Sequence, residues 1–286
     1  MPVFTDKRLA RPQGEGAPFQ VTAGAVALRE TPASDGLVST FALHGEAVEV
    51  FRKEGAFGLV QCQRDRYVGW ALMEALSAPI RPVTHKVSAL RTYAFSQADL
   101  KSAPHFMLSL GARVAATGRR EGPWVECARA GWVHERHLAG PGSFEDDPAA
   151  VALRFLGAPY LWGGRESLGL DCSGLLQQAF EACGVLLPRD SDMQGAWAGT
   201  EVSGTVRICP SDVRLCRGDV VFWEGHAGIL TAPDTLLHAN AHHMAVAEEP
   251  LAEAIERIGK IVGPVTGVRR IDLAAERGKR PAWRAA

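Results

Sequence analysis

Cys172 is the residue whose position in this sequence best suits a nucleophile. Apolar side chains follow it at positions 175, 176, 179, 180 and 183, and this spacing predicts a helix that ends at Gly184. Cys172 would then lie at the helix N-terminus, where unpaired N–H groups and the macrodipole lower a thiol pKa below its usual ~8.5. The alternative is that this cysteine is merely buried. Cys183, on the apolar side of the same helix, needs only a packing role.

A cysteine nucleophile needs a base, and two histidines lie where a sheet could supply one. His226 lies in residues 218–230, which we expect to form two strands joined by a tight turn, and His238 lies in a third strand. Because the histidines are 12 residues apart, an antiparallel hairpin can place them side by side. One ring would be the base and the other would orient it, so the set predicts a Cys-His-His triad. Each residue alone has an ordinary explanation, since a histidine after a turn commonly faces solvent.

Metal binding is the other chemistry that these side chains suggest. His238, His242 and His243 form a cluster, but adjacent residues of a strand point to opposite faces, so we expect no shared metal. Cys209 and Cys216 lack the CxxC spacing and second pair of a zinc knuckle, and we expect them to be buried or incidental. We therefore predict an enzyme without metal or cofactor.

The composition excludes several classes of partner. The 286 residues are 47% hydrophobic and 22% charged, which is typical of a globular protein. The chain has 31 Lys and Arg residues and 32 acidic residues. With a net charge of −1 it has no excess positive charge that would attract nucleic acid or an anionic membrane. Six cysteines are too sparse for a secreted disulfide framework, so we expect reduced thiols. Residues 1–12 lack the apolar stretch of a secretory signal, and we expect a cytoplasmic protein.

The N-terminal half of the chain has a residue pattern typical of short β-strands. Apolar runs broken by turn residues fill residues 20–76, and a similar texture returns over 82–139. Both segments close on a Gly-Trp dipeptide, Gly69-Trp70 in the first and Gly131-Trp132 in the second. We therefore predict two small SH3-like β-barrels in tandem. The alternative is a chance recurrence of Gly-Trp in a chain with 7 tryptophans and 30 glycines.

A new domain begins near residue 141. Residues 140–148 are rich in glycine, proline and acidic side chains, as in a linker, and a helix is expected over 149–155. A Gly-rich turn, the Cys172 helix and three strands follow, which is an α+β order of elements. The predicted parts are an N-terminal extension (1–19), a first barrel (20–80), a second barrel (81–140), a catalytic domain (141–270) and a basic tail (271–286) that we expect to be solvated.

Residues 147–268 resemble the NlpC/p60 family of papain-like cell-wall peptidases. Five motifs occur in the family's order: APYLWGG (158–164), DCSGL (171–175), LPRDS (187–191), GDVVF (218–222) and GHAGI (225–229). They resemble, in turn, the strand and turn before the nucleophile, the nucleophile motif, the substrate-side loop and the two strands of the histidine hairpin. Ala227 is a small departure, because many members have valine after the histidine.

The resemblance implies a papain-like α+β catalytic domain in which three residues carry the reaction. Cys172 would be the nucleophile, His226 the general base and then acid, and His238 the residue that fixes the imidazole. The backbone N–H of Cys172 would donate to the oxyanion. The resemblance also implies that a set of side chains lines the substrate cleft: Tyr160, Asp171, Ser173, Asp190 and Ser191.

The N-terminal segments resemble the SH3-like modules of intracellular members that recycle murein peptides. In that subgroup the resemblance implies cleavage between γ-linked D-glutamate and an L-diamino acid, in a peptide with a free N-terminal L-alanine. Glu46 and Tyr67 would hold the substrate ammonium, since a buried carboxylate pairs well with a cation. The alternative is that Glu46 is a solvated turn residue and Tyr67 a packing residue.

Two other functions stay open. Papain-like relatives include acyltransferases and amidases, and a triad alone does not choose among these reactions. The other alternative is a binding module whose barrels recognise wall peptides. The presence of all three residues Cys172, His226 and His238 argues against this alternative. The sequence thus predicts a murein-derived peptide as partner, and neither nucleic acid nor membrane.

Overall fold

The computed structural model divides the chain into two compact units. Unit 1 comprises Met1–Ser143 and unit 2 comprises Phe144–Ala285. The structure describes residues 6–203 and 215–284. Cys209, which the sequence predicts to be buried or incidental, lies outside the described residues.

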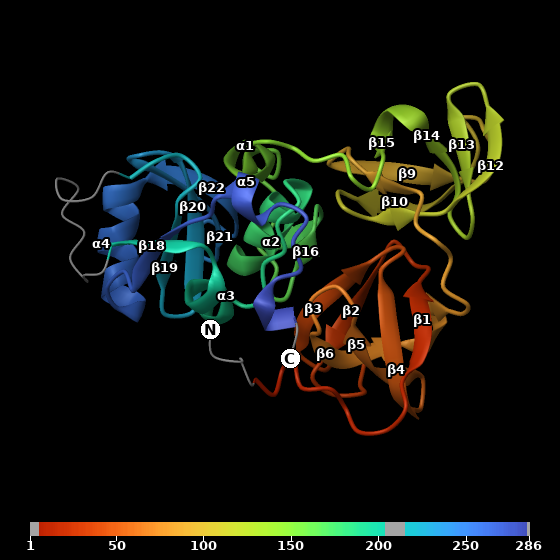
Figure 1. Ribbon diagram of the computed structural model, residues 1–286, viewed down its shortest axis with the longest axis horizontal. Coiled ribbons are helices and arrows are strands. Elements are labelled where there is room, and N and C mark those ends of the chain that lie inside the picture. Colours follow the sequence, from red (N-terminus) through yellow and green to blue (C-terminus); the bar gives the residue numbers. More distant parts are fainter. Residues whose placement is uncertain (1–5, 204–214, 285–286) are drawn as a thin grey trace. The chain divides into compact units, whose positions relative to one another are not determined.

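Unit 1 begins with an antiparallel sheet of seven strands, in the order β3-β2-β6-β5-β4-β1-β7 (Figure 1). Alternation along the strands builds its core, because Val26 and Leu28 of β2 point inward while their neighbours are half-buried. Leu72 is followed by a 3-10 turn that leads into the last short strand. The elements are β1 (Ala17–Val21), β2 (Ala25–Arg29), β3 (Val38–Leu43), β4 (Ala47–Glu54), β5 (Phe57–Cys62), β6 (Val68–Leu72), η1 (Met73–Ala75) and β7 (Leu76–Ser77).

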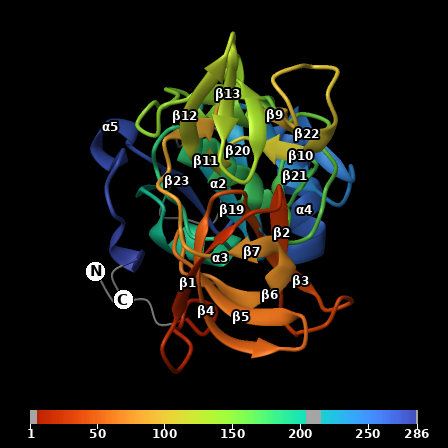
Figure 2. The same cartoon turned by 90° about the vertical axis from the view of Figure 1, so that its right-hand side faces the viewer.

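The second half of unit 1 repeats this strand order. Its five-stranded sheet runs β10-β9-β14-β13-β12, which corresponds position by position to β3-β2-β6-β5-β4. A three-stranded sheet, β11-β8-β15, completes it, and Figure 2 shows both halves from the side. The elements are β8 (His85–Val87), β9 (Arg91–Phe95), β10 (Pro104–Ser109), β11 (Arg113–Val114), β12 (Ala116–Glu121), β13 (Trp124–Cys127), β14 (Gly131–His134), η2 (Glu135–His137) and β15 (Leu138–Ala139).

The two Gly-Trp dipeptides occupy matching places in these sheets. Gly69-Trp70 lies in β6 and Gly131-Trp132 in β14, and a 3-10 turn and a two-residue strand follow each of them. Short strands fill residues 20–76, as the sequence predicts, and β8 to β15 occupy the segment 82–139 where a similar pattern was expected. That residues 81–140 form a second SH3-like barrel stays a prediction.

Unit 2 contains a six-stranded sheet, β18-β23-β19-β20-β21-β22, with α2 and α4 on opposite sides of it in Figure 1. The predicted helix, turn, helix and hairpin are present, but the sequence did not predict α3, α4, β22 or β23. The elements are α1 (Pro148–Leu153), β16 (Arg165–Glu166), β17 (Gly169–Leu170), α2 (Cys172–Ala182), α3 (Ser191–Trp197), β18 (Thr200–Ser203), β19 (Val220–Trp223), β20 (His226–Ala232), β21 (Thr235–Asn240), β22 (Ala245–Pro250), α4 (Leu251–Val262), β23 (Gly267–Arg270), α5 (Leu273–Glu276) and η3 (Ala282–Arg284).

Helix α2 is the buried element of unit 2. Residues 172–180 are all buried, and the helix packs against β20 and β21. Burial of a Leu or Phe side chain contributes about 1.5–3 kcal/mol, so Leu175, Leu176 and Phe180 hold this helix firmly in place. On the other side, α4 buries a narrower stripe against sheet residues such as Leu230 and Leu236. A helix fixed in this way can position a reactive residue at its first turn.

The basic tail is not simply solvated. Arg277 donates through Nε to the carbonyl of Cys183 at 3.0 Å and through Nη2 to Glu145 and Asp146 at 2.8 and 2.9 Å. These bonds tie the segment that follows α5 to the end of α2.

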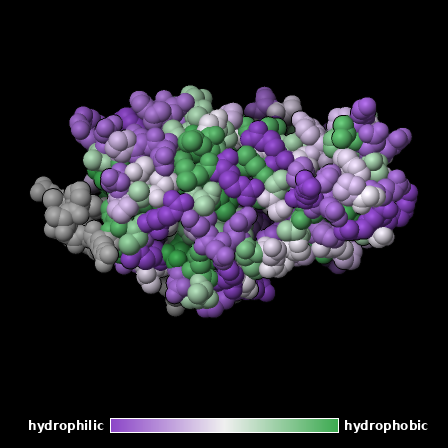
Figure 3. Space-filling view, turned by 90° about the horizontal axis from the view of Figure 1, so that it is seen from above, coloured by the Kyte–Doolittle hydropathy of each residue, from purple (hydrophilic) through white to green (hydrophobic). Residues whose placement is uncertain are grey.

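The surface mixes polar and apolar residues. On the face seen in Figure 3, hydrophobic residues are interspersed with hydrophilic ones. Large apolar side chains that stay exposed in unit 2 include Trp162, Leu168 and Met244. Among the described residues, no helix has the length and apolar character needed to span a membrane.

Candidate active site

Asp171 caps helix α2 and thereby places Cys172 at its first position. The Asp171 Oδ1 atom accepts a hydrogen bond from the Gly174 N–H at 2.7 Å, and its backbone carbonyl accepts from Leu175 N–H at 3.0 Å. A side-chain cap of this kind satisfies an N–H group that the first helical turn leaves unpaired. The prediction that Cys172 lies at the helix N-terminus is confirmed.

The Gly-rich turn packs directly on this first turn of α2. A Cβ atom at Gly174 would lie 2.1 Å from the carbonyl oxygen of Gly164, a separation that no side chain tolerates. The Asp171 N–H donates to the same carbonyl at 3.2 Å. The glycines of the two motifs therefore allow the backbone segments before and after the nucleophile to touch.

Arg189 is a site residue that the sequence did not single out, although it lies in the LPRDS motif. Its side chain is fully buried and donates to Asp171 twice, from Nη1 to Oδ1 at 2.9 Å and from Nη2 to Oδ2 at 2.6 Å. Nη1 also donates to Ser173 Oγ at 2.8 Å. The Asp171 carboxylate additionally accepts from the Gly163 N–H and from Ser173 Oγ. These bonds lock the residues on both sides of Cys172.

The two predicted histidines are in direct contact. Nε2 of His226 and Nδ1 of His238 lie 2.8 Å apart, and the ring centroids are separated by 5.0 Å. The β20–β21 register pairs Ile229 with Leu237, so the histidines are diagonal neighbours rather than directly opposite. Gly228 makes room between the strands, because a Cβ atom there would lie 3.0 Å from the His238 Cβ. The predicted meeting of the rings is confirmed, with this shift in register.

Glu249 and Arg257 extend the histidine pair and were not predicted. Nε2 of His238 lies 2.6 Å from Oε1 of Glu249, and Arg257 donates to the same carboxylate oxygen. Glu249 lies opposite Leu236 in the β21–β22 ladder and Arg257 lies on α4. Only the hairpin register could have indicated Glu249, and the turn over residues 241–244 that sets this register carries no clear sequence signal.

The Cys172 thiol is buried, and its pKa shifts against the direction predicted from the helix position. Burial raises its pKa to about 12, and the Asp171 carboxylate adds to the rise. Hydrogen bonds from the Ala227 and Ser173 N–H groups, together with the Arg189 charge, oppose the rise. Burial outweighs these effects, because the loss of surrounding water destabilises the thiolate more than the nearby donors and the Arg189 charge stabilise it. The sulfur therefore rests as a neutral thiol beside the backbone of Ala227, the neighbour of His226.

Both imidazoles are neutral at physiological pH. Burial lowers the pKa of His226 to about 3, and repulsion from a protonated His238 and from Arg257 lowers it further, while Glu249 acts in the opposite direction. Burial likewise lowers the pKa of His238 to about 4, against the hydrogen bond and charge of Glu249. A neutral imidazole has a lone pair and can accept a proton from a thiol.

The other predicted cleft residues differ in their burial and in their contacts. Tyr160 is half-buried, and its pKa is raised to about 12 by burial and by the neighbouring Cys172 and Asp171. Asp190 is the residue before α3 and Ser191 begins that helix, and both are half-buried. The Ser173 hydroxyl and the Asp171 carboxylate are engaged in the Arg189 network. A role of these residues in substrate binding stays a prediction.

Glu46 and Tyr67 lie in unit 1, and both are buried. Glu46 is 1% exposed, so the alternative of a solvated turn residue is wrong. Its Oε2 atom accepts from the Leu43 N–H at 3.1 Å, and Oε1 lies 3.8 Å from Nε of Arg64. The Tyr67 N–H donates to Asp65 Oδ1 at 3.1 Å.

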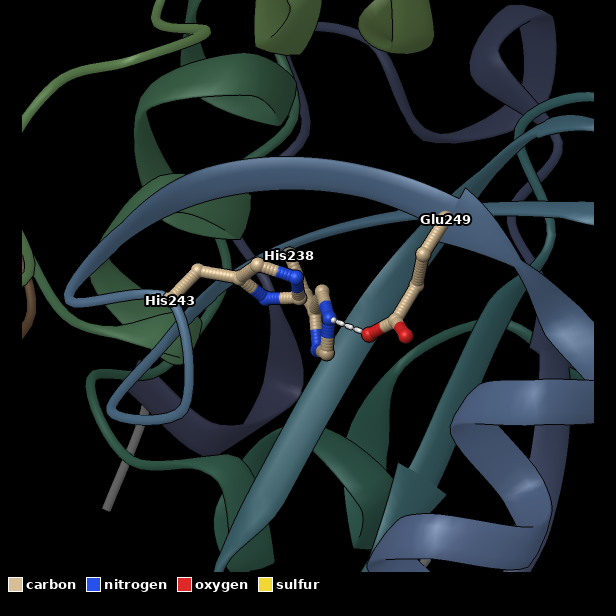
Figure 4. A group of neighbouring side chains, drawn as sticks. All are labelled: His238, His243 and Glu249. Atoms are coloured by element: carbon tan, nitrogen blue, oxygen red, sulfur yellow. Dashed lines mark hydrogen bonds and ion pairs between the residues drawn. The ribbon is translucent and has the colours of Figure 1, made fainter.

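One group of side chains has the composition of a metal site. His238, His243 and Glu249 offer ligand atoms within 4.8 Å of one another, and Figure 4 shows the His238–Glu249 hydrogen bond beside His243. His242 and His243 lie in a turn, so the expectation that they face opposite sides of a strand is wrong. His243 contacts Asn240 through Nδ1 at 3.0 Å. Because Nε2 of His238 is already engaged with Glu249, we assign no metal to this group.

Family models match both units of the chain. The model described as the NlpC/P60 family matches residues 157–256, which include Cys172, His226, His238 and Glu249. This chain carries an NlpC/P60 domain. A model described as the bacterial dipeptidyl-peptidase Sh3 domain matches residues 28–76, so an SH3 domain precedes the NlpC/P60 domain. The resemblance to the NlpC/p60 family is confirmed for residues 157–256, and the resemblance to an SH3 domain is confirmed for residues 28–76.

Curated relatives of the NlpC/P60 domain include peptidases. Dipeptidyl-peptidase 6 of Lysinibacillus sphaericus is 29% identical over 115 residues, which cover 39% of this chain and 40% of that protein. The gamma-D-glutamyl-L-lysine dipeptidyl-peptidase of Bacillus subtilis is 32% identical over 102 residues, covering 33% and 31%. The chain thus spans less than half the length of each of these relatives.

Solved structures share the fold of this chain over most of its length. The crystal structure of an NlpC/P60 family protein from Bacillus cereus covers 89% of this chain and 99% of its own, with a TM-score of 0.72 and 18% identity. An NlpC/P60 endopeptidase from Photobacterium damselae covers 87% and 70%, with a TM-score of 0.58 and 14% identity. At these identities the likeness concerns the fold alone.

Proposed function

We propose that this chain is a cysteine peptidase that cleaves the bond between γ-linked D-glutamate and an L-diamino acid in free murein peptides. The observation that carries the proposal is the 2.8 Å contact between Nε2 of His226 and Nδ1 of His238. Cys172 holds the first position of a buried helix, and its sulfur accepts a hydrogen bond from the backbone N–H of Ala227, the neighbour of His226. This combination supplies a nucleophile, a base and an orienting group in one NlpC/P60 domain.

Acylation starts from a neutral thiol and a neutral imidazole. The Cys172 sulfur attacks the γ-carbonyl carbon of D-glutamate while His226 takes the thiol proton, so no separate ion pair must form first. The carbonyl oxygen becomes an oxyanion, which accepts a hydrogen bond from the backbone N–H of Cys172. The C–N bond then breaks, and His226 gives its proton to the amine of the leaving diamino acid. The product is a thioester on Cys172.

Deacylation repeats these steps with water. His226 takes a proton from a water molecule that attacks the thioester carbonyl, and the thiolate that leaves is protonated by the same imidazole. L-Ala-D-Glu is released and the resting site is restored. His238 keeps the ring of His226 oriented through both halves of the reaction.

The substrate class is supported by the names of relatives and by the SH3 domain. The B. subtilis relative is named for a γ-D-glutamyl-L-lysine bond, and the matched SH3 model is described as that of dipeptidyl-peptidases. We propose that Glu46 and Tyr67 bind the ammonium group of the N-terminal L-alanine. An ammonium paired with a buried carboxylate favours peptides with a free N-terminus over blocked or glycan-linked ones. Such an enzyme would act in recycling rather than on intact wall.

A peptide panel tests the activity and the specificity together. L-Ala-γ-D-Glu-L-Lys and its meso-diaminopimelate counterpart, each free or N-acetylated, are incubated with the protein, and products are identified by mass spectrometry. We expect hydrolysis at the γ-D-glutamyl bond and at least about a 10-fold loss of kcat/KM on acetylation. Glu46→Gln should reduce this preference for the free amine.

Two variants separate the nucleophile from a passive cysteine on the same helix. Cys172→Ala should abolish turnover, whereas Cys183→Ala, whose thiol is buried at the far end of α2, should keep it. Continued cleavage by Cys172→Ala would exclude the mechanism. Transfer of an acyl group to an added amine, without hydrolysis of either tripeptide, would favour an acyltransferase instead.

A further inference from the structure

Glu249 is placed to control the protonation pattern of both histidines. Its carboxylate is acceptor-only, because partial burial raises its pKa but hydrogen bonds from Arg257 and His238 leave that pKa below its usual value. Its oxygen lies 2.6 Å from Nε2 of His238, so this ring nitrogen must carry the hydrogen. In a neutral imidazole the other nitrogen is then an acceptor.

The protonated nitrogen of His238 determines in turn which ring nitrogen of His226 carries hydrogen. Nδ1 of His238 lies 2.8 Å from Nε2 of His226, and since Nδ1 is an acceptor, Nε2 of His226 must be the donor. His226 is left with its lone pair on Nδ1. We propose that Glu249 is a positioning residue that sets the tautomer of His238 and, through it, makes Nδ1 of His226 the atom that accepts the Cys172 proton.

The charges around the pair indicate that orientation, rather than charge, is the main effect. The negative charge of Glu249 favours protonation of His226, but the positive charge of Arg257 opposes it. Arg257 also donates to the carboxylate oxygen that His238 contacts. The His238 side chain is fully buried, Glu249 is 11% exposed and Arg257 is 24% exposed. A partly buried, charge-compensated carboxylate is suited to hold a hydrogen bond in one direction.

The proposal rests on the proposed function only for its effect on catalysis, because tautomers are observable without substrate. Protein labelled with ¹⁵N-histidine reports which ring nitrogen is protonated through two-bond and three-bond ¹H–¹⁵N correlations, with His226→Gln and His238→Gln used for assignment. We expect both rings of the wild type to carry hydrogen on Nε2. In Glu249→Ala the His238 signal should shift toward a mixture of tautomers, even if no murein peptide is ever cleaved.

The kinetic readout uses matched variants from the same hairpin. Glu249→Ala should lower kcat on the order of 10²-fold with KM within about 3-fold, since orienting groups act on the chemical step. Glu249→Gln keeps an oxygen for Arg257 and His238 and should restore most of kcat. Glu248→Ala removes an adjacent carboxylate that instead contacts Thr231, and it should leave both tautomers and kcat unchanged.

Three results would overturn the proposal. The first is a folded Glu249→Ala protein whose histidine tautomers and kcat are the same as those of the wild type. The second is a wild-type protein in which His238 carries its hydrogen on Nδ1. The third is loss of activity with EDTA and recovery with Zn²⁺, because Nε2 of His238 would then be a metal ligand. His243→Gln separates this last case, since a metal held by His238, His243 and Glu249 needs His243 and the tautomer relay does not.

Discussion

Arg189 and Asp171 form a buried bidentate ion pair directly behind the nucleophile. Their two contacts measure 2.9 and 2.6 Å, and the Asp171 carboxylate also caps the helix that carries Cys172. A guanidinium matches a carboxylate in this planar geometry, which a lysine cannot do. The position of the sulfur therefore depends on an arginine that is fully buried.

Removing this arginine should destabilise unit 2 strongly. In Arg189→Met the Asp171 carboxylate stays buried without its charge partner, so we expect a loss of about 3–5 kcal/mol in the free energy of unfolding. Urea unfolding measures this loss. Arg217→Ala is the matched control, because its pair with Asp147 is about 40% exposed on both sides and should cost at most about 1 kcal/mol. Equal losses in the two variants would show that the buried pair has no special role.

Cys172 should react slowly with iodoacetamide, because only its thiolate is nucleophilic and the resting residue is a neutral thiol. Because burial raises its pKa to about 12, its thiolate fraction should increase about tenfold per pH unit between pH 7 and 9. Mass spectrometry of the peptide that contains Cys172 gives this rate separately from the other cysteines. A rate that is constant from pH 5 to 8 would instead indicate a preformed thiolate–imidazolium pair, and the mechanism would need that step added.

The histidine pair should make unit 2 less stable in mild acid. In the unfolded chain both histidines titrate near 6.5, but in the folded protein their pKa values are about 3 and about 4. As the pH falls below 6.5 the unfolded state binds protons first, so stability present above 6.5 is lost progressively down to the folded pKa values. Each histidine can contribute up to about 1.4 kcal/mol per pH unit in this window.

Hydrogen exchange of peptides covering residues 220–240 at pH 7, 6 and 5 follows this loss locally. The double variant His226→Gln, His238→Gln lacks both titrating rings and should show a smaller change in opening free energy. Carboxylates elsewhere contribute equally to both proteins. The same pH dependence in the variant would mean that other groups account for the effect.

Gly174 should not tolerate a side chain. A Cβ atom at this position would lie 2.1 Å from the Gly164 carbonyl, so Gly174→Ala must push the turn away from α2 and displace Cys172. We expect loss of activity and a lower melting temperature. Gly259→Ala is the control, because it also lies in a helix but its Cβ would meet nothing within 4 Å. That change should stabilise the protein by about 0.5–1 kcal/mol.

Local signals in the sequence were sufficient to identify the helix that carries Cys172 and the hairpin that carries His226 and His238. Apolar spacing identified the helix after Cys172, since apolar residues that recur every three to four positions lie along one side of a helix. Turn residues and alternating apolar runs identified the hairpin that carries His226 and His238. These signals are local, because propensity, capping and periodicity depend on residues a few positions apart. The family motifs lie within the same short segments.

Tertiary structure alone decided how these pieces meet and which groups support them. The Arg189–Asp171 pair joins residues 18 positions apart, and Glu249 reaches His238 only through the register of β21 and β22. Burial reversed the expected pKa shift of Cys172, because desolvation depends on everything packed around the sulfur and not on its place in a helix. Strand register and desolvation depend on contacts between segments that are far apart in the sequence. Local residue patterns therefore do not predict them.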